Sequence, residues 1–389
     1  MTEHSTSHKI VVIGGGYAGT VAANHLRLRD DVDITLVNSR SRFVERIRLH
    51  QFVAGNYDPS VDYGTILGDG IELVVDHATR IDTALRKVEL ASGHALDYDY
   101  VIYAVGSTGA VPSCVPGAAD FAYCVAELES AQRLRAGLAE LPADAVVTVV
   151  GGGLTGIETA AELAEQGRKV TLVAGRTLAP TLGAPACRSV AMWLSENGVT
   201  VLEGTGVAEV CPNAVVLTDS AVRQSALTIW TAGFGVPGLA AASGLRVDEL
   251  GRLLTDETLT SVDDDRIVAA GDAGSPSGRP LRMSCQAAIP LGVQAADTVL
   301  SRIAGTAPAV LDQGFKGVLV SLGRHAGLRQ LVSADDTPLD TWFDGQEGAQ
   351  MKEEQCRRTV MGIGMEARNP GTVVWYKPGP RVEQTAAAR

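Results

Sequence analysis

The sequence predicts an α/β fold, because a strand, a glycine-rich turn and a helix follow one another in two separate places. The first copy begins with the apolar run 10–13, passes through Gly14, Gly16 and Gly19, and continues as an alanine-rich helical pattern. The second copy has the same order of parts over residues 145–164. Runs of β-branched residues favour strands, whereas apolar residues three and four apart favour helices. Two copies of this motif, each flanked by a strand and a helix, are far more specific evidence for the fold than one copy.

Each glycine of the motif has a physical role in binding a dinucleotide. Gly14 lets the chain turn, Gly16 lets the backbone approach a pyrophosphate, and Gly19 lets the helix pack closely on the strand. The diphosphate would lie at the helix N-terminus, where free N–H groups favour an anion. The same three roles fall in the second copy to Gly151, Gly153 and Gly156. We therefore predict two dinucleotide sites.

Composition limits the class of protein and its partners. The 389 residues are enough for two or three domains, and 46% of them are hydrophobic. The net charge of −12 argues against nucleic acid as a partner. No run of about 18 apolar residues occurs, so no membrane span is expected. The polar residues 1–8 lack the apolar core of a signal peptide, which makes the cytoplasm the expected location.

The six cysteines are scattered along the chain, and none belongs to a CxxC motif. Their spacing therefore spells out neither a zinc site nor a disulfide framework, and no metal is expected. In a reduced compartment such residues act mostly as small apolar fillers.

The second strand, 32–37, ends in Asn38. An acid about 20 residues beyond the glycines usually bonds the ribose hydroxyls of the dinucleotide. Here the residue is an amide, which can still exchange hydrogen bonds with a diol. Arg42 follows closely and would reach the cofactor phosphates or the adenine.

The segment 39–51 carries four arginines and allows two interpretations. Charge-rich runs are commonly solvated surface helices. Alternatively, Arg48, His50 or Gln51 faces a bound anionic or quinonoid group in an active site. Both interpretations remain open at the level of sequence.

Short strands over 71–75, 87–90 and 98–103 are predicted to form a meander. The last strand runs into Ala104-Val105-Gly106. A strand that ends in a turn of small residues lets the backbone press on a flat ligand.

A further strand, 267–270, ends in Gly271-Asp272. With the two glycine motifs and Ala104-Val105-Gly106, this completes an ordered set that resembles the two-dinucleotide flavoprotein reductases of the pyridine nucleotide–disulfide oxidoreductase fold. The resemblance implies that the first glycine motif holds tightly but non-covalently bound FAD and the second holds NADPH or NADH. It also implies that the NAD(P) domain is inserted in the FAD domain, and that Gly271-Asp272 contacts the flavin ribityl and pyrophosphate.

Within that fold the chain looks most like type II NAD(P)H dehydrogenases and apoptosis-inducing-factor-like reductases. Gln51 and Gln286 match family segments beside the flavin, whereas His50 replaces a tyrosine. Pro290 and Leu291 replace paired glutamines that are associated with quinone binding in the family. The redox-disulfide branch is excluded, because residues 39–55 contain no cysteine pair.

The expected nicotinamide site departs from the common NAD pattern. The strand that ends at Val173 is followed by Ala174-Gly175-Arg176, where an enzyme that prefers NAD places an acid. An arginine would attract a 2′-phosphate, so NADPH is favoured over NADH. The resemblance places Glu158 near the nicotinamide, although a first-turn acid is also favoured by the helix dipole alone. Gly233 lies in the segment that closes this domain.

The C-terminal part predicts a small α+β domain, which in related reductases lies over the flavin and often supplies the dimer contact, so a homodimer is a prediction as well. The predicted divisions are the FAD-binding domain in two parts (1–115 and 251–310), the NAD(P)-binding domain (116–250), the C-terminal α+β domain (311–376) and a disordered tail (377–389).

The predicted activity is that of an FAD-dependent NAD(P)H dehydrogenase or reductase, which takes hydride from NAD(P)H and passes electrons to a small acceptor such as a quinone or an aromatic metabolite. No side-chain nucleophile is needed, because the flavin carries the chemistry. Two alternatives remain: a reductase of a small electron-carrier protein of the ferredoxin or rubredoxin type, and a flavin-containing redox-sensing binding protein with incidental turnover. Rapid reoxidation by a quinone would favour the first reading over the last.

Overall fold

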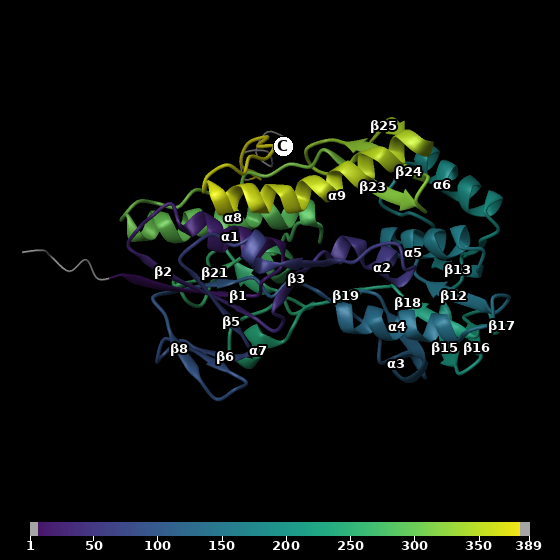
Figure 1. Ribbon diagram of the computed structural model, residues 1–389, viewed down its shortest axis with the longest axis horizontal. Helices are drawn as coiled ribbons and strands as arrows, with labels where there is room; N and C mark the ends of the chain where they lie inside the picture. The colour runs from purple at the N-terminus through teal and green to yellow at the C-terminus, as the bar shows by residue number, and fades with distance from the viewer. Residues whose placement is uncertain (1–6, 382–389) are drawn as a thin grey trace, which may run out of the picture.

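Two parallel five-stranded sheets form the two main units of the computed structural model, which describes residues 7–381 (Figure 1). The first sheet has the order β21-β9-β1-β2-β5. Its strands are β1 (His8–Ile13), β2 (Val32–Asn38), β5 (Ile71–Val75), β9 (Tyr100–Tyr103) and β21 (Ile267–Ala269). The apolar residues of β1 are almost fully buried, as expected for a strand covered on both faces.

The second sheet repeats this arrangement in the order β11-β18-β12-β13-β14, again all parallel. Its strands are β11 (Ala122–Cys124), β12 (Val146–Val150), β13 (Lys169–Gly175), β14 (Thr200–Glu203) and β18 (Leu227–Trp230). The predicted α/β class with two Rossmann-like units is confirmed.

The chain crosses between the two units at one antiparallel pair, β10 (Thr108–Gly109) with β19 (Phe234–Gly235). The second sheet is therefore an insertion in the first unit. After this pair the chain packs again on the first unit, because Leu239 and Leu245 lie in its core. The helix α7 (Leu239–Ala242) carries the first of these residues against β6.

The predicted meander is wrong in its membership. The antiparallel meander consists of β6 (Ala78–Asp82), β7 (Lys87–Leu90) and β8 (Ala95–Asp97), whereas 71–75 and 100–103 belong to the parallel sheet. The pattern of apolar residues predicts where a strand lies but not which strand it pairs with. Strands that are adjacent in the sequence therefore need not be neighbours in a sheet.

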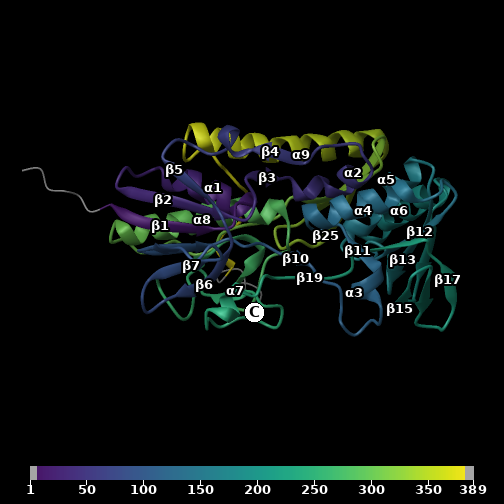
Figure 2. The same cartoon turned by 60° about the horizontal axis from the view of Figure 1, so that its bottom comes forward.

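Helices cover both units. The helix α1 (Tyr17–Leu26) packs along α8 (Cys285–Ile303), and α9 (Gly345–Arg368) runs over them and on across the second unit (Figures 1 and 2). The helix of the second glycine motif is α5 (Leu154–Glu165). The remaining α-helices are α2 (Leu49–Val53), α3 (Ala118–Phe121), α4 (Leu128–Glu140) and α6 (Ala184–Glu196).

Smaller sheets complete the fold. The C-terminal α+β part consists of α9 on an antiparallel sheet of β23 (Gly317–Leu322), β24 (Ala326–Val332) and β25 (Pro338–Phe343). The others are the pairs β3 (Arg42–Val44) with β4 (Ser60–Asp62) and β20 (Leu253–Thr255) with β22 (Gly274–Pro276), and the sheet of β15 (Val207–Cys211), β16 (Ala214–Leu217) and β17 (Val222–Gln224).

The last described residues are held against the body of the protein. The Gly379 N–H donates to Asp312 Oδ1 at 2.8 Å, and Arg381 pairs with Glu257 at 2.9 Å. These contacts lie within residues 377–381 of the predicted tail, and residues 382–389 of that prediction, like residues 1–6, lie outside the described part. Within residues 7–381, no helix has the length and apolar character needed to cross a membrane.

Candidate active site

One cavity of about 1240 Å³ connects the two units and the C-terminal part. One end is the glycine turn of the second unit, the middle lies at Ser107 and Asp272, and the other end lies between α8, β23 and α9. Three segments far apart in the sequence therefore meet around a single space.

The first glycine motif has the backbone that its sequence predicted. Gly14 has a φ of 104°, and a Cβ there would clash with the Ala104 carbonyl. A Cβ on Gly19 would clash with the Gly14 carbonyl, whereas no atom lies within 4 Å of a Cβ on Gly16. The N-terminus of α1 has no side-chain cap. Open space in front of uncapped N–H groups fits a pyrophosphate.

The second motif repeats this geometry. Gly151 has a φ of 124°, a Cβ on Gly156 would clash with the Gly151 carbonyl, and the space in front of Gly153 is open. The N-terminus of α5 has no side-chain cap either. Both ends therefore offer the same kind of anion site. Gly151, Gly153, Gly233 and the exposed Arg176 line the cavity here.

The structure brings the Ala104-Val105-Gly106 turn and the Gly271-Asp272 turn together, because β9 and β21 are neighbours. The Ser107 hydroxyl, one residue after the first turn, donates to Asp272 Oδ2 at 2.7 Å. Arg46 donates to the same hydroxyl at 3.1 Å. Arg46, Ser107 and Asp272 all line the cavity, so this hydrogen-bonded chain presents polar groups at its centre.

Of the residues expected at the first dinucleotide, Asp272 lines the cavity, whereas the first glycine motif, Asn38, Arg42, residues 104–106 and Gly271 do not. Asn38 Oδ1 accepts from the Gly15 N–H at 3.0 Å, and its amide nitrogen donates to the Arg40 carbonyl. Arg42 is exposed and lies 3.9 Å from Asp62. Asn38 thus holds the shape of the glycine turn, and Arg42 pairs on the surface.

Glu158 is the most strongly connected group in the cavity wall. It is 7% exposed, its Oε1 lies 2.6 Å from Lys352 Nζ, and it accepts from the Ser321 N–H at 3.0 Å. Burial favours the protonated acid, but the Lys352 ammonium outweighs it and holds the pKa of Glu158 below its ordinary value. Glu158 and Lys352 therefore form a buried ion pair.

His50 lies beside this pair and is 4% exposed. Its Nε2 is 3.1 Å from the Ser321 hydroxyl, and its Nδ1 is 3.7 Å from Glu158. Burial, helped by the nearby Lys352 ammonium, lowers the pKa of His50 to about 4, so the ring is neutral at pH 7.

Arg48 and Gln51 lie behind the cavity wall, so the segment 39–51 is neither a solvated helix nor wholly an active-site surface. Arg48 is 2% exposed, donates to Gln51, makes a two-point bond to Glu353, and stacks on Tyr57. These contacts fix α2 against α9, and His50 is the predicted member of the trio that lines the cavity.

Gln286 lies at the opposite end of the cavity, at the start of α8. Its amide accepts from Arg282 at 3.3 Å and, in the reversed orientation, bridges the Lys316 N–H and the Gly317 carbonyl. In the reversed orientation it joins α8 to the start of β23.

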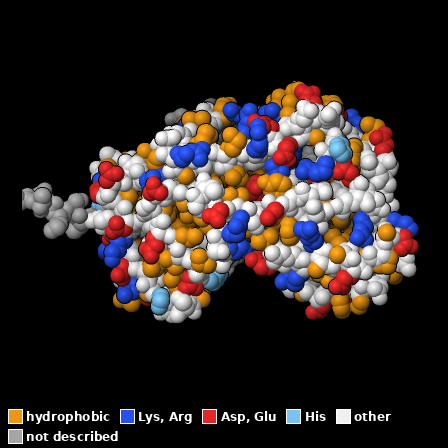
Figure 3. Space-filling model, viewed as in Figure 1, with side chains coloured by type: hydrophobic (Ala, Val, Ile, Leu, Met, Phe, Trp, Pro, Cys, Tyr) orange, Lys and Arg blue, Asp and Glu red, His pale blue; other side chains and the backbone are white. Residues whose placement is uncertain are grey.

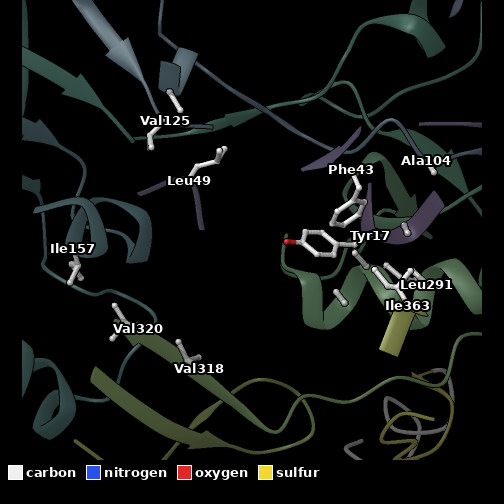
Figure 4. Close-up of a cluster of buried hydrophobic side chains, with 14 of the residues drawn as sticks. Tyr17, Phe43, Leu49, Ala104, Val125, Ile157, Leu291, Val318, Val320 and Ile363 are labelled. Carbon is white, nitrogen blue, oxygen red and sulfur yellow. The ribbon is translucent and has the colours of Figure 1, made fainter. Parts of the chain in front are cut away.

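Sequence reasoning missed several groups that line the cavity, among them Tyr17, Lys352 and the segment 372–376. Figure 4 shows the Tyr17 ring against Phe43, with its hydroxyl directed away from Leu291 and Ile363. This hydroxyl is buried and has no hydrogen-bond partner within residues 7–381. A buried, unpartnered hydroxyl facing open space fits a bound polar group. The proline-free run 345–368 is the signal that would have revealed α9 and, with it, Lys352.

Comparison with known proteins places this geometry in context. Residues 8–292 match the family described as pyridine nucleotide-disulphide oxidoreductase. The NADH dehydrogenase-like protein Rv1812c of Mycobacterium tuberculosis is 32% identical over 368 residues, which cover 82% of this chain and 91% of that protein. The type II NADH:quinone oxidoreductase of Staphylococcus haemolyticus is 27% identical, and the match covers 92% of this chain and 96% of that protein.

Solved structures show the same fold at lower identity. NDH2 from Plasmodium falciparum in complex with NADH has a TM-score of 0.78 at 16% identity and covers 94% of this chain and 99% of that one. The sulfide:quinone oxidoreductase of Aquifex aeolicus has a TM-score of 0.78 at 17% identity, and the match covers 98% of this chain and 94% of that one.

Proposed function

The chain belongs to the pyridine nucleotide-disulphide oxidoreductase family and is an NAD(P)H dehydrogenase or reductase; from that premise we propose that it binds FAD at the first glycine motif and NADPH at the second, and reduces a small quinone or aromatic acceptor. The observation that carries this proposal is the duplicated glycine turn, with Gly14 and Gly151 both at positive φ and both units contributing to one cavity.

The residues of the first unit fit FAD. The open space at Gly16 and the uncapped start of α1 would hold the pyrophosphate, and Asp272, fixed by Ser107, would bond the ribityl hydroxyls. The chemistry that bound FAD supplies is acceptance of a hydride from the nicotinamide and return of two electrons to the acceptor.

The residues of the second unit fit a nicotinamide dinucleotide. Gly153 and the start of α5 would bind its pyrophosphate, and Arg176 would attract a 2′-phosphate. NADPH is thus the proposed donor, although the named relatives are described by NADH. Neutral His50 and the Glu158–Lys352 pair would orient the nicotinamide without adding a net charge beside it.

Arg48 and Gln51 are proposed as positioning residues, because their contacts hold α2 and thereby His50. Gln286 is proposed to orient the flavin or the acceptor from the start of α8. The division into FAD, NAD(P) and C-terminal parts, the homodimer and the cytoplasmic location remain predictions.

An anaerobic titration tests the proposal. The purified FAD-loaded protein is titrated with NADPH and NADH separately while the flavin absorbance is followed, and menadione is then added. We expect rapid bleaching by NADPH and rapid reoxidation by menadione. If neither nicotinamide bleaches the flavin, hydride transfer is wrong; if NADH is much faster, the role of Arg176 is wrong.

A further inference from the structure

The end of the cavity beyond Gln286 is a chamber with walls from four segments, which we call the acceptor chamber. It is formed by the start of α8, by β23 and β24, by the inner side of α9 and by the segment 372–376. Its apolar wall includes Val318, Leu319, Met365 and Trp375. Such a surface suits a flat aromatic ring.

Cations dominate the polar part of this chamber. Arg282, Lys316, Arg329 and Arg358 line it, whereas no carboxylate among residues 7–381 lines this end of the cavity. The outer face in Figure 3, by contrast, has acidic and basic side chains interspersed. An excess of positive charge inside a chain of net charge −12 is a local feature that the overall composition does not explain.

Two of the four cations already have carboxylate partners outside the chamber wall. Arg282 Nε lies 3.1 Å from Asp336, and its guanidinium lies over the Phe315 ring. Arg358 Nε lies 2.6 Å from Glu354. Their charges are therefore largely compensated within the protein.

Arg329 and Lys316 have no such compensation. Arg329 is half-buried on β24, and within the described part of the chain its side chain makes no hydrogen bond or ion pair. It lies over Gly317, where an added Cβ would be 3.7 Å from its Nε. Lys316 contacts only a ring, with its Nζ 5.7 Å from the centre of Tyr376. Lys316 is exposed to water, but Arg329 is partly removed from it. Removing a cation from water without an anion is costly, so a partner from the ligand is expected for Arg329.

We propose that the acceptor is an anionic aromatic compound, whose carboxylate or sulfonate group is bound by Arg329 with Lys316 at the mouth of the chamber. This inference rests on the proposed function and names its substrate class. A guanidinium makes two parallel bonds to the two oxygens of a carboxylate or to two oxygens of a sulfonate, which gives geometry as well as attraction. The absence of glutamines at Pro290 and Leu291 agrees with recognition by charge.

The test compares an anionic and a neutral quinone on the oxidised FAD-loaded protein. Binding of 1,4-naphthoquinone-2-sulfonate and of menadione is measured by isothermal titration in wild type, Arg329→Gln and Lys316→Gln. We expect Arg329→Gln to weaken binding of the sulfonate on the order of tenfold and to leave menadione within about twofold. Lys316→Gln should have a smaller effect of the same sign. Arg223→Gln, which removes an equal charge from exposed β17 outside the cavity, should change neither.

Kinetics supply a second readout that does not depend on the nicotinamide. The protein is reduced with dithionite, and its reoxidation by each quinone is followed at low and high salt. Reoxidation of the flavin by the sulfonate should become slower at high salt and in Arg329→Gln. Reoxidation by menadione should change in neither case. Equal losses for both quinones, or no loss for either, would overturn the proposal. Failure of NADPH to reduce the flavin would count against the proposed function alone.

Discussion

The Nζ of Lys352 lies 2.6 Å from Oε1 of Glu158, and this ion pair joins α9 to α5, the helix of the second glycine motif. Both side chains are buried, so each charge depends on the other. The pair also forms part of the wall beside His50, and it therefore links the stability of the fold to the shape of the site.

Lys352→Met should be strongly destabilising, because it leaves the Glu158 carboxylate buried without its cation. We expect a loss of about 3 kcal/mol in the free energy of unfolding, measured by urea denaturation of the FAD-loaded protein. Lys169→Met, at an exposed position, is the matched control. Glu158→Gln and the double variant complete the cycle, and the double variant should lose less than the sum of the two single losses. A loss equal to that sum would mean that the pair is not coupled.

Stability should fall on the alkaline side because of His25. Its Nδ1 lies 2.6 Å from Glu366 and its Nε2 lies 3.0 Å from Asp297. Burial lowers the pKa of His25, but the two carboxylates outweigh it and raise the pKa to about 9. The rise from 6.5 corresponds to about 3 kcal/mol, fully present below pH 6.5 and lost as pH rises through 9.

The measurement is urea denaturation at pH 6 and pH 9.5. His25→Gln should have a clearly lower free energy of unfolding than wild type at pH 6, and this difference should be smaller at pH 9.5. His94→Gln, on the surface, should follow wild type at both values. A gap independent of pH would show that His25 is not protonated in the fold.

Arg176→Asp should change the choice of nicotinamide. An acid at this position would repel a 2′-phosphate and bond a 2′-hydroxyl. We expect the KM for NADPH to rise by roughly tenfold or more while that for NADH falls or stays the same, measured by steady-state turnover with menadione. An equal change for both dinucleotides would place Arg176 away from the ribose.

Alanine in place of Gly14 or Gly151, which both have positive φ, should show which cofactor each site binds. Gly14→Ala adds a methyl group against the Ala104 carbonyl at a φ of 104°, so the purified protein should lose its yellow colour. Gly151→Ala should retain FAD and lose reduction by NADPH. Gly238→Ala, with no atom within 4 Å of the new carbon, is the control. Loss of FAD from Gly151→Ala alone would reverse the assignment of the two sites.

Much of the fold could be predicted from the sequence, because it depends on backbone turns between residues that are adjacent in the chain. At Gly14 and Gly151 a strand must end, turn and enter a helix within a few residues, and the side chains that permit this are adjacent in the chain. The same holds for Gly271-Asp272. Strand partners, by contrast, are chosen at a distance along the chain, which is why residues 71–75 belong to the parallel sheet and not to the predicted meander.

The sequence by itself determined the two dinucleotide units, their order and the residues of their turns, since these depend on short-range backbone geometry. Only the tertiary structure decided that Arg48 is buried behind the wall, that Glu158 pairs with Lys352, and that Arg329 enters the cavity without a partner. The physical reason is that the solvation and pairing of a charge depend on what folding brings around it, and α9 reaches Glu158 from the far end of the chain.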